Sequence, residues 1–253
     1  MDQIWLYSII SVIIVSLISL IGIFTLSLTD RFLKKILMFL VSFSAGALLG
    51  DAFIHLIPEL VEEYGFGLNI SLYILLGIIV FFVLEKFIHW HHCHHSRDAH
   101  EHEHHVRPLA WNNVVSDFFH NFLDGLIIAG SYSISVPLGI ATTLAVIFHE
   151  IPQEIGDFGL LVYAGFSKAK ALFFNFLSSL SAIIGAIVGL LLTTGIDKFE
   201  LILIPLTAGH FIYIAAADVI PELHKETNVK KSLVQLLGLI LGIGVMVLLV
   251  LME

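Results

Sequence analysis

The chain has 253 residues, of which 58% are hydrophobic and only 13% charged, and its mean hydropathy is +0.96. Soluble domains carry about 25% charged residues, so this composition excludes an ordinary soluble domain and indicates a polytopic membrane protein. The net charge of −9 comes from loops and a few polar positions, which is not the pattern of a nucleic-acid-binding protein. The single cysteine, Cys93, excludes an internal disulfide.

Apolar runs long enough to cross a membrane recur along the chain. A spanning helix needs about 20 apolar residues, and windows of that size predict eight helices, near 4–27, 35–60, 68–88, 110–132, 137–163, 169–194, 200–222 and 231–251. Strands of a membrane barrel would instead alternate strictly over about 10 residues. We therefore expect an all-α polytopic membrane protein, with one transmembrane transporter domain over 1–253 and a histidine-rich loop at 89–107. The first run has no basic region before it, which favours a retained helix over a cleaved signal peptide.

The distribution of Lys and Arg predicts the orientation in the membrane. Cytoplasmic loops of membrane proteins carry an excess of these residues. With the N-terminus outside, eleven of the 12 basic residues fall in inward loops, and only Lys198 falls in an outward one. We therefore expect both termini outside and the 89–107 loop in the cytoplasm.

Two segments near the ends of the chain resemble each other. Residues 44–60 (SAGALLGDAFIHLIPEL) and 207–223 (TAGHFIYIAAADVIPEL) agree at seven of 17 positions without a gap. Two unrelated membrane helices with a biased alphabet are one explanation. The charge rule, however, makes the first segment run outward and the second inward. This favours an inverted repeat of helices 1–3 and 6–8 around helices 4–5, a recurrent plan of secondary transporters.

The expected fourth and fifth helices are polar at their centres. HNFLDG at 120–125 and HEIPQEIGDF at 149–158 both lie inside apolar runs. Residues three and four apart share a helix face, which stacks His120 with Asp124 and Glu150 with Glu154. Each charged side chain at a helix centre costs roughly 2.5–3.5 kcal/mol, and neither helix holds a Lys or Arg near its centre to neutralise them. Protons, water or a bound cation must do so.

The side chains of this polar centre suit a metal ion. Imidazole, carboxylate and amide oxygen together favour a borderline divalent metal such as Zn²⁺, with Fe²⁺ or Mn²⁺ as alternatives. Two histidines and several acids exceed the needs of one tetrahedral zinc, so the set also suits two metals bridged by Glu150 or Asp124. A proline kink at Pro152 with polar contacts between helices is the competing interpretation. It explains Asn121 or one aspartate, but not the whole set.

Further polar residues in the apolar runs are candidates for the transport pathway. A histidine in a membrane helix can equally serve only to hydrogen-bond a neighbour, so these assignments rest on position alone. We predict that the outer half is lined by Asp51, His55 and Glu59, and the inner half by His210, Asp218 and Glu222, with Asn175 as an extra oxygen ligand. Residues 87–107 hold nine histidines, which suits metal buffering or sensing, or a soluble spacer.

HNFLDG followed by HEIPQEIGDF resembles the ZIP family of zinc and iron permeases, and most closely the branch whose fifth helix reads HEIPHE. The similarity is specific in these two motifs and extends over the chain in the number of helices, the outward termini and the histidine-rich loop. It implies import of zinc into the cytoplasm by an elevator-like movement of the helices that hold the metal. It also implies a binuclear centre whose ligands would be His120, Asn121, Asp124, His149, Glu150 and Gln153.

One position departs from that branch, because the chain has Gln153 where the branch has histidine. An amide oxygen is a weaker zinc ligand than imidazole, so the site either binds zinc more weakly or favours harder metals such as Mn²⁺ or Fe²⁺. Glu154 would compensate only if the helix rotates. The expected substrate is Zn²⁺, with Fe²⁺, Mn²⁺ and Cd²⁺ as alternatives, and no cofactor is expected. The chain lacks the large extracellular domain of many animal members, which indicates a compact microbial form in the cell (inner) membrane.

Other functions fit the sequence less well than transport. An intramembrane metalloprotease carries HExxH, whereas this chain reads HEIPQ and lacks the second histidine, so we expect no enzyme. The inverted repeat argues against a metal-sensing receptor, because a receptor needs no matched inner and outer half-sites. No GxxxxGK[ST] motif occurs, so a gradient rather than ATP must drive transport. The expected partners are the metal ion and the bilayer. A homodimer is left open, because Gly185 and Gly189 suit either a partner helix or packing within one chain.

Overall fold

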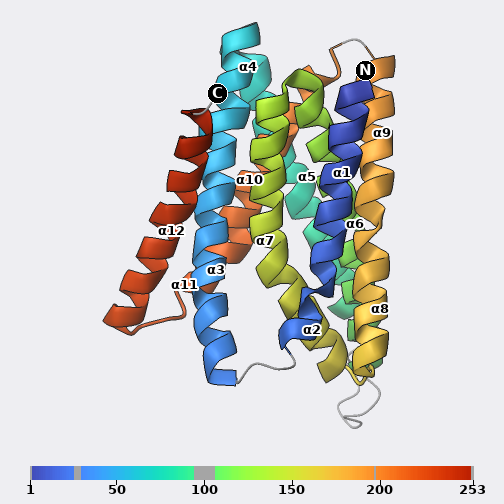
Figure 1. Cartoon of the computed structure of the whole chain (residues 1–253), viewed down its shortest axis with the longest axis vertical. Coiled ribbons are helices and arrows are strands. Elements are labelled where there is room, and N and C mark those ends of the chain that lie inside the picture. Colours follow the sequence, from blue (N-terminus) through green and yellow to red (C-terminus); the bar gives the residue numbers. More distant parts are fainter. Residues whose placement is uncertain (1, 26–29, 94–105, 197, 252–253) are drawn as a thin grey trace.

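The computed structural model of the chain describes residues 2–25, 30–93, 106–196 and 198–251, and every regular element within them is helical (Figure 1). In chain order these elements are α1 (Asp2–Ile18), the 3₁₀ turn η1 (Ser19–Ile21), α2 (Gly22–Thr25), α3 (Asp30–Gly50), the π-helix η2 (Asp51–Leu56), α4 (Ile57–Tyr64), α5 (Leu68–Cys93), α6 (Val106–Ile134), α7 (Val136–Tyr163), α8 (Lys168–Ser179), α9 (Ser181–Gly195), α10 (Glu200–Tyr213), the π-helix η3 (Ile214–Val219), α11 (Ile220–Leu223) and α12 (Val229–Val250). The all-α prediction is confirmed for these residues.

Long apolar helices dominate the described part of the chain. Four helical segments are long and apolar enough to cross a membrane, namely Gln3–Phe24, Ile36–Glu62, Lys168–Gly195 and Val229–Val250. Leu68–Leu84 and Leu201–Ala217 are apolar but shorter. The two helices that hold the polar motifs, α6 and α7, have 29 and 28 residues. The chain is thus a helical membrane protein, and the number of eight spans stays a prediction.

The helices associate in two groups. Bundle A consists of α1, α6, α7, α8 and α9, and bundle B consists of α3, α5, α10 and α12, in which α3 packs along α12 and α5 along α10. The two bundles meet where α3 packs against α7 and α10 against α6. Figure 1 shows α3 and α12 on one side of the molecule and α1, α8 and α9 on the other. The helices with the polar motifs belong to bundle A and lie at the boundary with bundle B.

The two similar segments share an unusual backbone feature. Each contains a π-helix that ends just before an Ile-Pro-Glu-Leu sequence, η2 before Pro58 and η3 before Pro221. In each, the N–H of the isoleucine before the proline bonds five residues back, Ile57 to Ala52 and Ile220 to Ala215. Proline lacks the N–H that continues an α-helix, and a π-turn accommodates the break.

Close helix contacts also match between the two segments. A Cβ on Gly46 would overlap the carbonyl oxygen of Leu239 on α12, and one on the equivalent Gly209 would overlap that of Ile74 on α5. Glycines on the facing helices make the same kind of contact. A Cβ on Gly242 of α12 would overlap the carbonyl oxygen of Phe43 on α3, and one on Gly77 of α5 would overlap that of Leu206 on α10. Residues 43 and 206 are themselves equivalent in the ungapped alignment. Helix pairs α3–α12 and α5–α10 are therefore held together in the same way.

Gly185 and Gly189 of α9 serve packing within the chain. A Cβ on Gly185 would overlap the carbonyl oxygen of Phe122 on α6, and one on Gly189 would lie 2.8 Å from that of Leu126. Small residues let helix backbones approach closely in membranes. The structure thus decides between the two roles that the sequence allowed for these glycines, while the homodimer stays a prediction.

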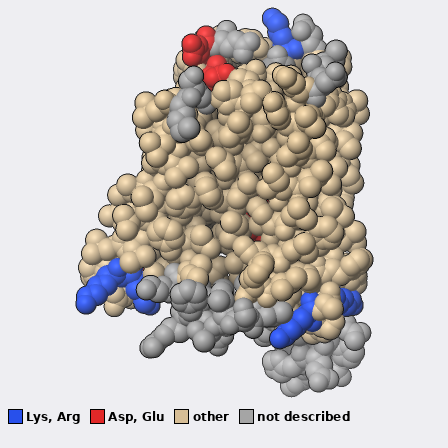
Figure 2. All heavy atoms as spheres, viewed as in Figure 1, with Lys and Arg blue, Asp and Glu red and all other residues tan. Residues whose placement is uncertain are grey.

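Charged side chains lie at the two ends of the face shown in Figure 2, and the middle of that face carries almost none. One end, called here the basic end, holds the starts of α8 and α12 (Figure 1), which carry Lys168, Lys170, Lys230 and Lys231. Lys198 lies in the connection from α9 to α10, at the opposite end. Of these five lysines, Lys198 is therefore separated from the other four, as the loop pattern predicts.

Candidate metal centre

Four side chains from α6 and α7 meet in the interior. His120 and Asp124 are one turn apart on α6, and His149 and Glu150 are adjacent on α7. One possible ligand atom from each lies within 4.8 Å of all the others. Asp124 and Glu150 are 0% exposed and His149 is 3% exposed. Buried carboxylates among imidazoles, with no Lys or Arg in the group, are a typical metal-ligand set.

The distances between these atoms suit one tetrahedral ion. The two imidazole Nε2 atoms are 3.2 Å apart, and His149 Nε2 lies 3.1 Å from Asp124 Oδ2. Glu150 Oε1 lies 3.2 Å from His120 Nε2 and 3.5 Å from His149 Nε2, and His120 Nε2 lies 3.5 Å from Asp124 Oδ2. Ligand atoms at about 2.0–2.1 Å from a tetrahedral zinc lie roughly 3.3 Å apart. These five separations are close to that spacing, so the four side chains could hold a single ion.

A backbone contact orients one of the imidazoles. Nδ1 of His149 lies 3.1 Å from the carbonyl oxygen of Ala145, one turn earlier on α7. Because the carbonyl can only accept, Nδ1 donates in this contact, and Nε2 is the ring nitrogen that faces the centre and would bind a metal ion. Metal-ligating histidines are commonly fixed in this way.

An oxygen cluster lies beside this centre, toward the start of α6. The Asn121 amide donates to Asp117 Oδ1 at 2.8 Å, the Ser178 hydroxyl donates to the other oxygen of Asp117, and the Asn175 amide donates to Glu154. Four buried oxygens then have no hydrogen-bond donor among the described residues, namely Asn121 Oδ1, Asn175 Oδ1, Glu154 Oε1 and Glu150 Oε2. Since buried polar atoms are normally satisfied, these oxygens suit a cation.

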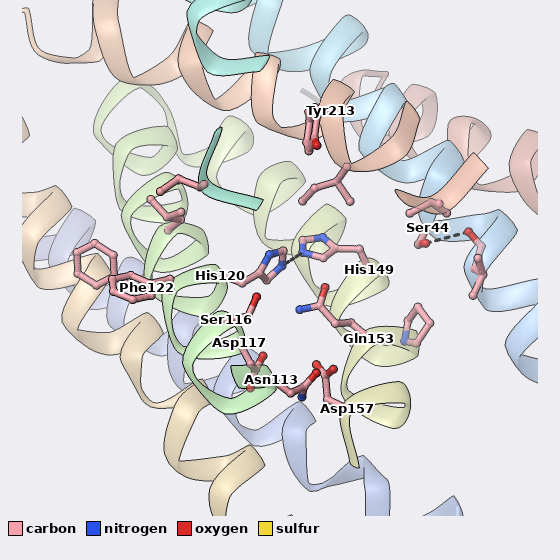
Figure 3. A pocket seen from close by; sticks show the side chains of 17 residues that line it. Ser44, Asn113, Ser116, Asp117, His120, Phe122, His149, Gln153, Asp157 and Tyr213 are labelled. Atoms are coloured by element: carbon pink, nitrogen blue, oxygen red, sulfur yellow. Dashed lines mark hydrogen bonds between the residues drawn. The ribbon is translucent and has the colours of Figure 1, made fainter. Parts of the chain in front are cut away.

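A cavity of about 820 Å³ leads to the centre (Figure 3). It is lined by His120 and His149 and, one to two turns nearer the start of α6 and the end of α7, by Asp117, Gln153 and Asp157. The chain passes from the end of α7 to the start of α8, so the cavity extends toward the basic end. On the other side of the centre, α6 and α7 bury apolar residues such as Ile128 and Val146.

The family model of the ZIP zinc transporters matches residues 2–107 and 89–250. The chain belongs to the ZIP family. Zinc transporter zipt-7.1 of Caenorhabditis briggsae is 32% identical over 99% of this chain and 80% of its own length. Zinc transporter SLC39A7 of Homo sapiens is 30% identical over 87% of this chain and 65% of its own length. Zinc transporter YKE4 of Saccharomyces cerevisiae is 33% identical over 84% of this chain and 70% of its own length.

ZIP membership confirms the resemblance inferred from the two motifs and places the chain among transporters rather than enzymes. Together with the apolar helices, it establishes an integral membrane protein. These relatives come from a nematode, a mammal and a yeast, so they give no support to the expectation of a microbial cell (inner) membrane.

The structure brings most of the predicted ZIP ligands together. His120, Asp124, His149 and Glu150 form the central group, while Asn121 and Glu154 belong to the oxygen cluster with Asn175. Gln153 lies one turn beyond His149 and lines the cavity.

The predicted pathway residues lie in several places. Asp51 and His55 are buried together on η2, with Nδ1 of His55 3.4 Å from Asp51 Oδ1, and Glu59 is half-buried on α4. His210 lies at the central group, with Nε2 3.8 Å from Asp124 Oδ1, rather than deeper in the inner half. The side chains of Asp218 and Glu222 and residues 94–105 of the histidine-rich loop lie outside the described residues.

Sequence reasoning missed Ser178. This residue follows Asn175 by three positions on α8, so the two share a face and both point at carboxylates of bundle A. Two polar residues at that spacing within an apolar run were the signal that could have identified it.

Proposed function

We propose that the chain is a secondary transporter that imports divalent metal, first of all Zn²⁺, into the cytoplasm through the centre on α6 and α7. The observation that carries this proposal is the set of four ligand atoms on α6 and α7, five of whose separations are 3.1–3.5 Å. Membership in the ZIP zinc transporter family and the similarity to zinc transporters of other organisms support zinc as the substrate.

The proposed direction rests on charge and on the cavity. If the basic end is cytoplasmic, as the charge rule indicates, both termini lie outside. The cavity then connects the centre with the cytoplasmic side, which suits a conformation that releases metal inward. A metal ion on this route would pass Asp117, Gln153 and Asp157 after leaving the two imidazoles.

The proposed mechanism uses an inverted repeat over eight spanning helices. The matched π-helices and the matched glycine contacts of α3–α12 and α5–α10 support it. In such folds one group of helices moves against the other around the binding site. Here bundle A, which holds the four ligands, would slide along bundle B. Asp51, His55 and Glu59 would line the outer entrance, and Asp218 and Glu222 would line the exit.

A direct test is zinc uptake into proteoliposomes that hold the purified full-length chain. We expect saturable uptake driven by the zinc gradient, with competition by Mn²⁺ because Gln153 offers oxygen where the related branch offers imidazole. Protein-free liposomes give the background. Zinc binding without uptake above that background would contradict a transport function.

The oxygen cluster is proposed as the second position of a binuclear centre. Its unpartnered oxygens come from Asn121, Glu150, Glu154 and Asn175, and Glu150 would bridge the two ions. Oxygen ligands favour harder cations than the imidazole site does. The second ion would therefore be held more weakly and exchange first.

The double variant Glu154→Gln, Asn175→Leu is expected to bind one equivalent of metal where the unaltered chain binds two. Asn175→Leu removes an oxygen of the cluster, and Glu154→Gln removes the negative charge and one of the two carboxylate oxygens, while the four central side chains stay in place. Metal content after equilibrium dialysis measures the stoichiometry. Glu62→Gln, which neutralises an exposed carboxylate on α4, is the matched control. One equivalent in the unaltered chain would exclude the binuclear centre.

A further inference from the structure

Among the described residues, His210 is the one histidine at the centre that comes from bundle B. It lies on α10 in bundle B, whereas the four proposed ligands lie on α6 and α7 in bundle A. The side chain is 1% exposed, and its ring centroid lies 3.6 Å from that of Phe81 on α5 and 5.9 Å from that of His120. The ring is thus held by bundle B and points at a residue of bundle A.

His210 and Asp124 each have an unmet hydrogen-bonding atom. Both ring nitrogens of His210 and Oδ1 of Asp124 are buried without a partner among the described residues. Oδ2 of the same carboxylate faces His149 at 3.1 Å. Nε2 of His210 lies 3.8 Å from Asp124 Oδ1, so a shift of less than 1 Å completes an N–H···O bond. Since buried polar atoms without partners are costly, a hydrogen bond between Nε2 of His210 and Oδ1 of Asp124 would be favourable.

We propose that His210 is a positioning residue that donates from Nε2 to Asp124 Oδ1 and so turns Oδ2 toward the metal. This inference rests on the proposed function, because it takes Asp124 as a ligand of the transported ion. Four protein atoms already complete the tetrahedral set, so a fifth direct ligand is not needed. Carboxylates that bind metals are themselves commonly fixed by an outer hydrogen bond.

The bond would also link metal binding to the relative position of the two bundles. Asp124 moves with α6, and His210 stays with α10 and Phe81. The bond can form only while α6 and α10 keep the register seen here. Any position of the bundles that breaks it leaves Asp124 less well oriented, and metal affinity falls. By thermodynamic reciprocity, bound metal then favours the arrangement in which the bond exists.

The test compares the full-length chain with His210→Ala and His210→Gln in detergent. Zinc affinity is measured by competition with a chromophoric chelator, and the visible absorption of bound Co²⁺ reports the geometry. Loss of an outer partner typically weakens metal binding by about 10–100-fold. We expect that loss in His210→Ala, a tetrahedral Co²⁺ spectrum in both variants, and substantial recovery in His210→Gln, whose amide N–H can donate. His224→Ala, which removes an exposed imidazole, should match the unaltered chain.

Two results would overturn the positioning role. The first is unaltered zinc affinity in His210→Ala. The second is an equal loss in His210→Gln with a changed Co²⁺ coordination, which would make His210 a direct ligand.

His149→Ala reports on the proposed function separately. If zinc binding does not depend on His149, the assignment of the metal centre to α6 and α7 is wrong. If it does, and His210→Ala binds normally, only the present inference fails. Thermal unfolding of each variant verifies that it is folded.

Discussion

The double variant His149→Ala, Glu150→Ala is expected to lose saturable zinc uptake in proteoliposomes. It removes two of the four central ligand atoms and leaves one imidazole and one carboxylate on α6. Zinc sites in proteins use three or four protein ligands, so two do not hold the ion against water. The variant also leaves Asp124 Oδ2 without the imidazole that lies 3.1 Å away. Uptake of radiolabelled zinc at several concentrations measures the effect.

The matched control for this variant is His224→Ala, Glu62→Ala. It also removes one imidazole and one carboxylate, but both side chains are exposed and lie outside the centre. We expect uptake within about twofold of the unaltered chain, since surface substitutions usually change little. Uptake by His149→Ala, Glu150→Ala at the rate of the unaltered chain would mean that the substrate does not use the helix α7 motif.

Gly185→Ala is expected to destabilise the protein strongly although it adds a single methyl group. The new Cβ would overlap the carbonyl oxygen of Phe122 and lie 2.8 Å from its carbonyl carbon, so α9 and α6 must separate. Overpacking a well-packed interior costs about 1–3 kcal/mol, occasionally more. Because these atoms are backbone, no rotamer change relieves the clash, and we expect the upper part of that range. Separation of α6 also displaces His120 and Asp124.

Gly244→Ala gives the comparison for this prediction. Gly244 lies in α12, and a Cβ there meets nothing within 4 Å. Alanine favours a helix over glycine by about 1 kcal/mol, so this variant should be neutral or more stable. Thermal unfolding in detergent measures both. Equal midpoints for Gly185→Ala and the unaltered chain would show that α6 and α9 are not packed as described.

The central group could be predicted from the sequence because its geometry is mostly local. His120 and Asp124 share a face at a spacing of four, and His149 and Glu150 stand out as buried polar residues in an apolar run. The π-helices before Pro58 and Pro221 were not predicted, because a proline alone does not specify one: Pro152 and Pro205 lie inside the α-helices α7 and α10.

Contacts between the bundles could not be predicted from the sequence. His210 and Asp124 are distant along the chain, and their approach depends on the register of α10 against α6. Within bundle B, glycines set the register of α10 against α5 by meeting particular carbonyls, as Gly209 meets Ile74, and a glycine alone does not tell which carbonyl it meets. Ser178 was missed for the same reason, because its partner Asp117 lies on a helix of distant sequence.

Anomalous diffraction at the zinc edge from crystals of the zinc-loaded chain tests the central claim most directly. We predict a strong peak bounded by His120 Nε2, Asp124 Oδ2, His149 Nε2 and Glu150 Oε1. Each ligand distance should be about 2.0–2.2 Å, with the shorter values to nitrogen. A strong peak elsewhere, with none between these four atoms, would contradict the assignment of the centre on α6 and α7.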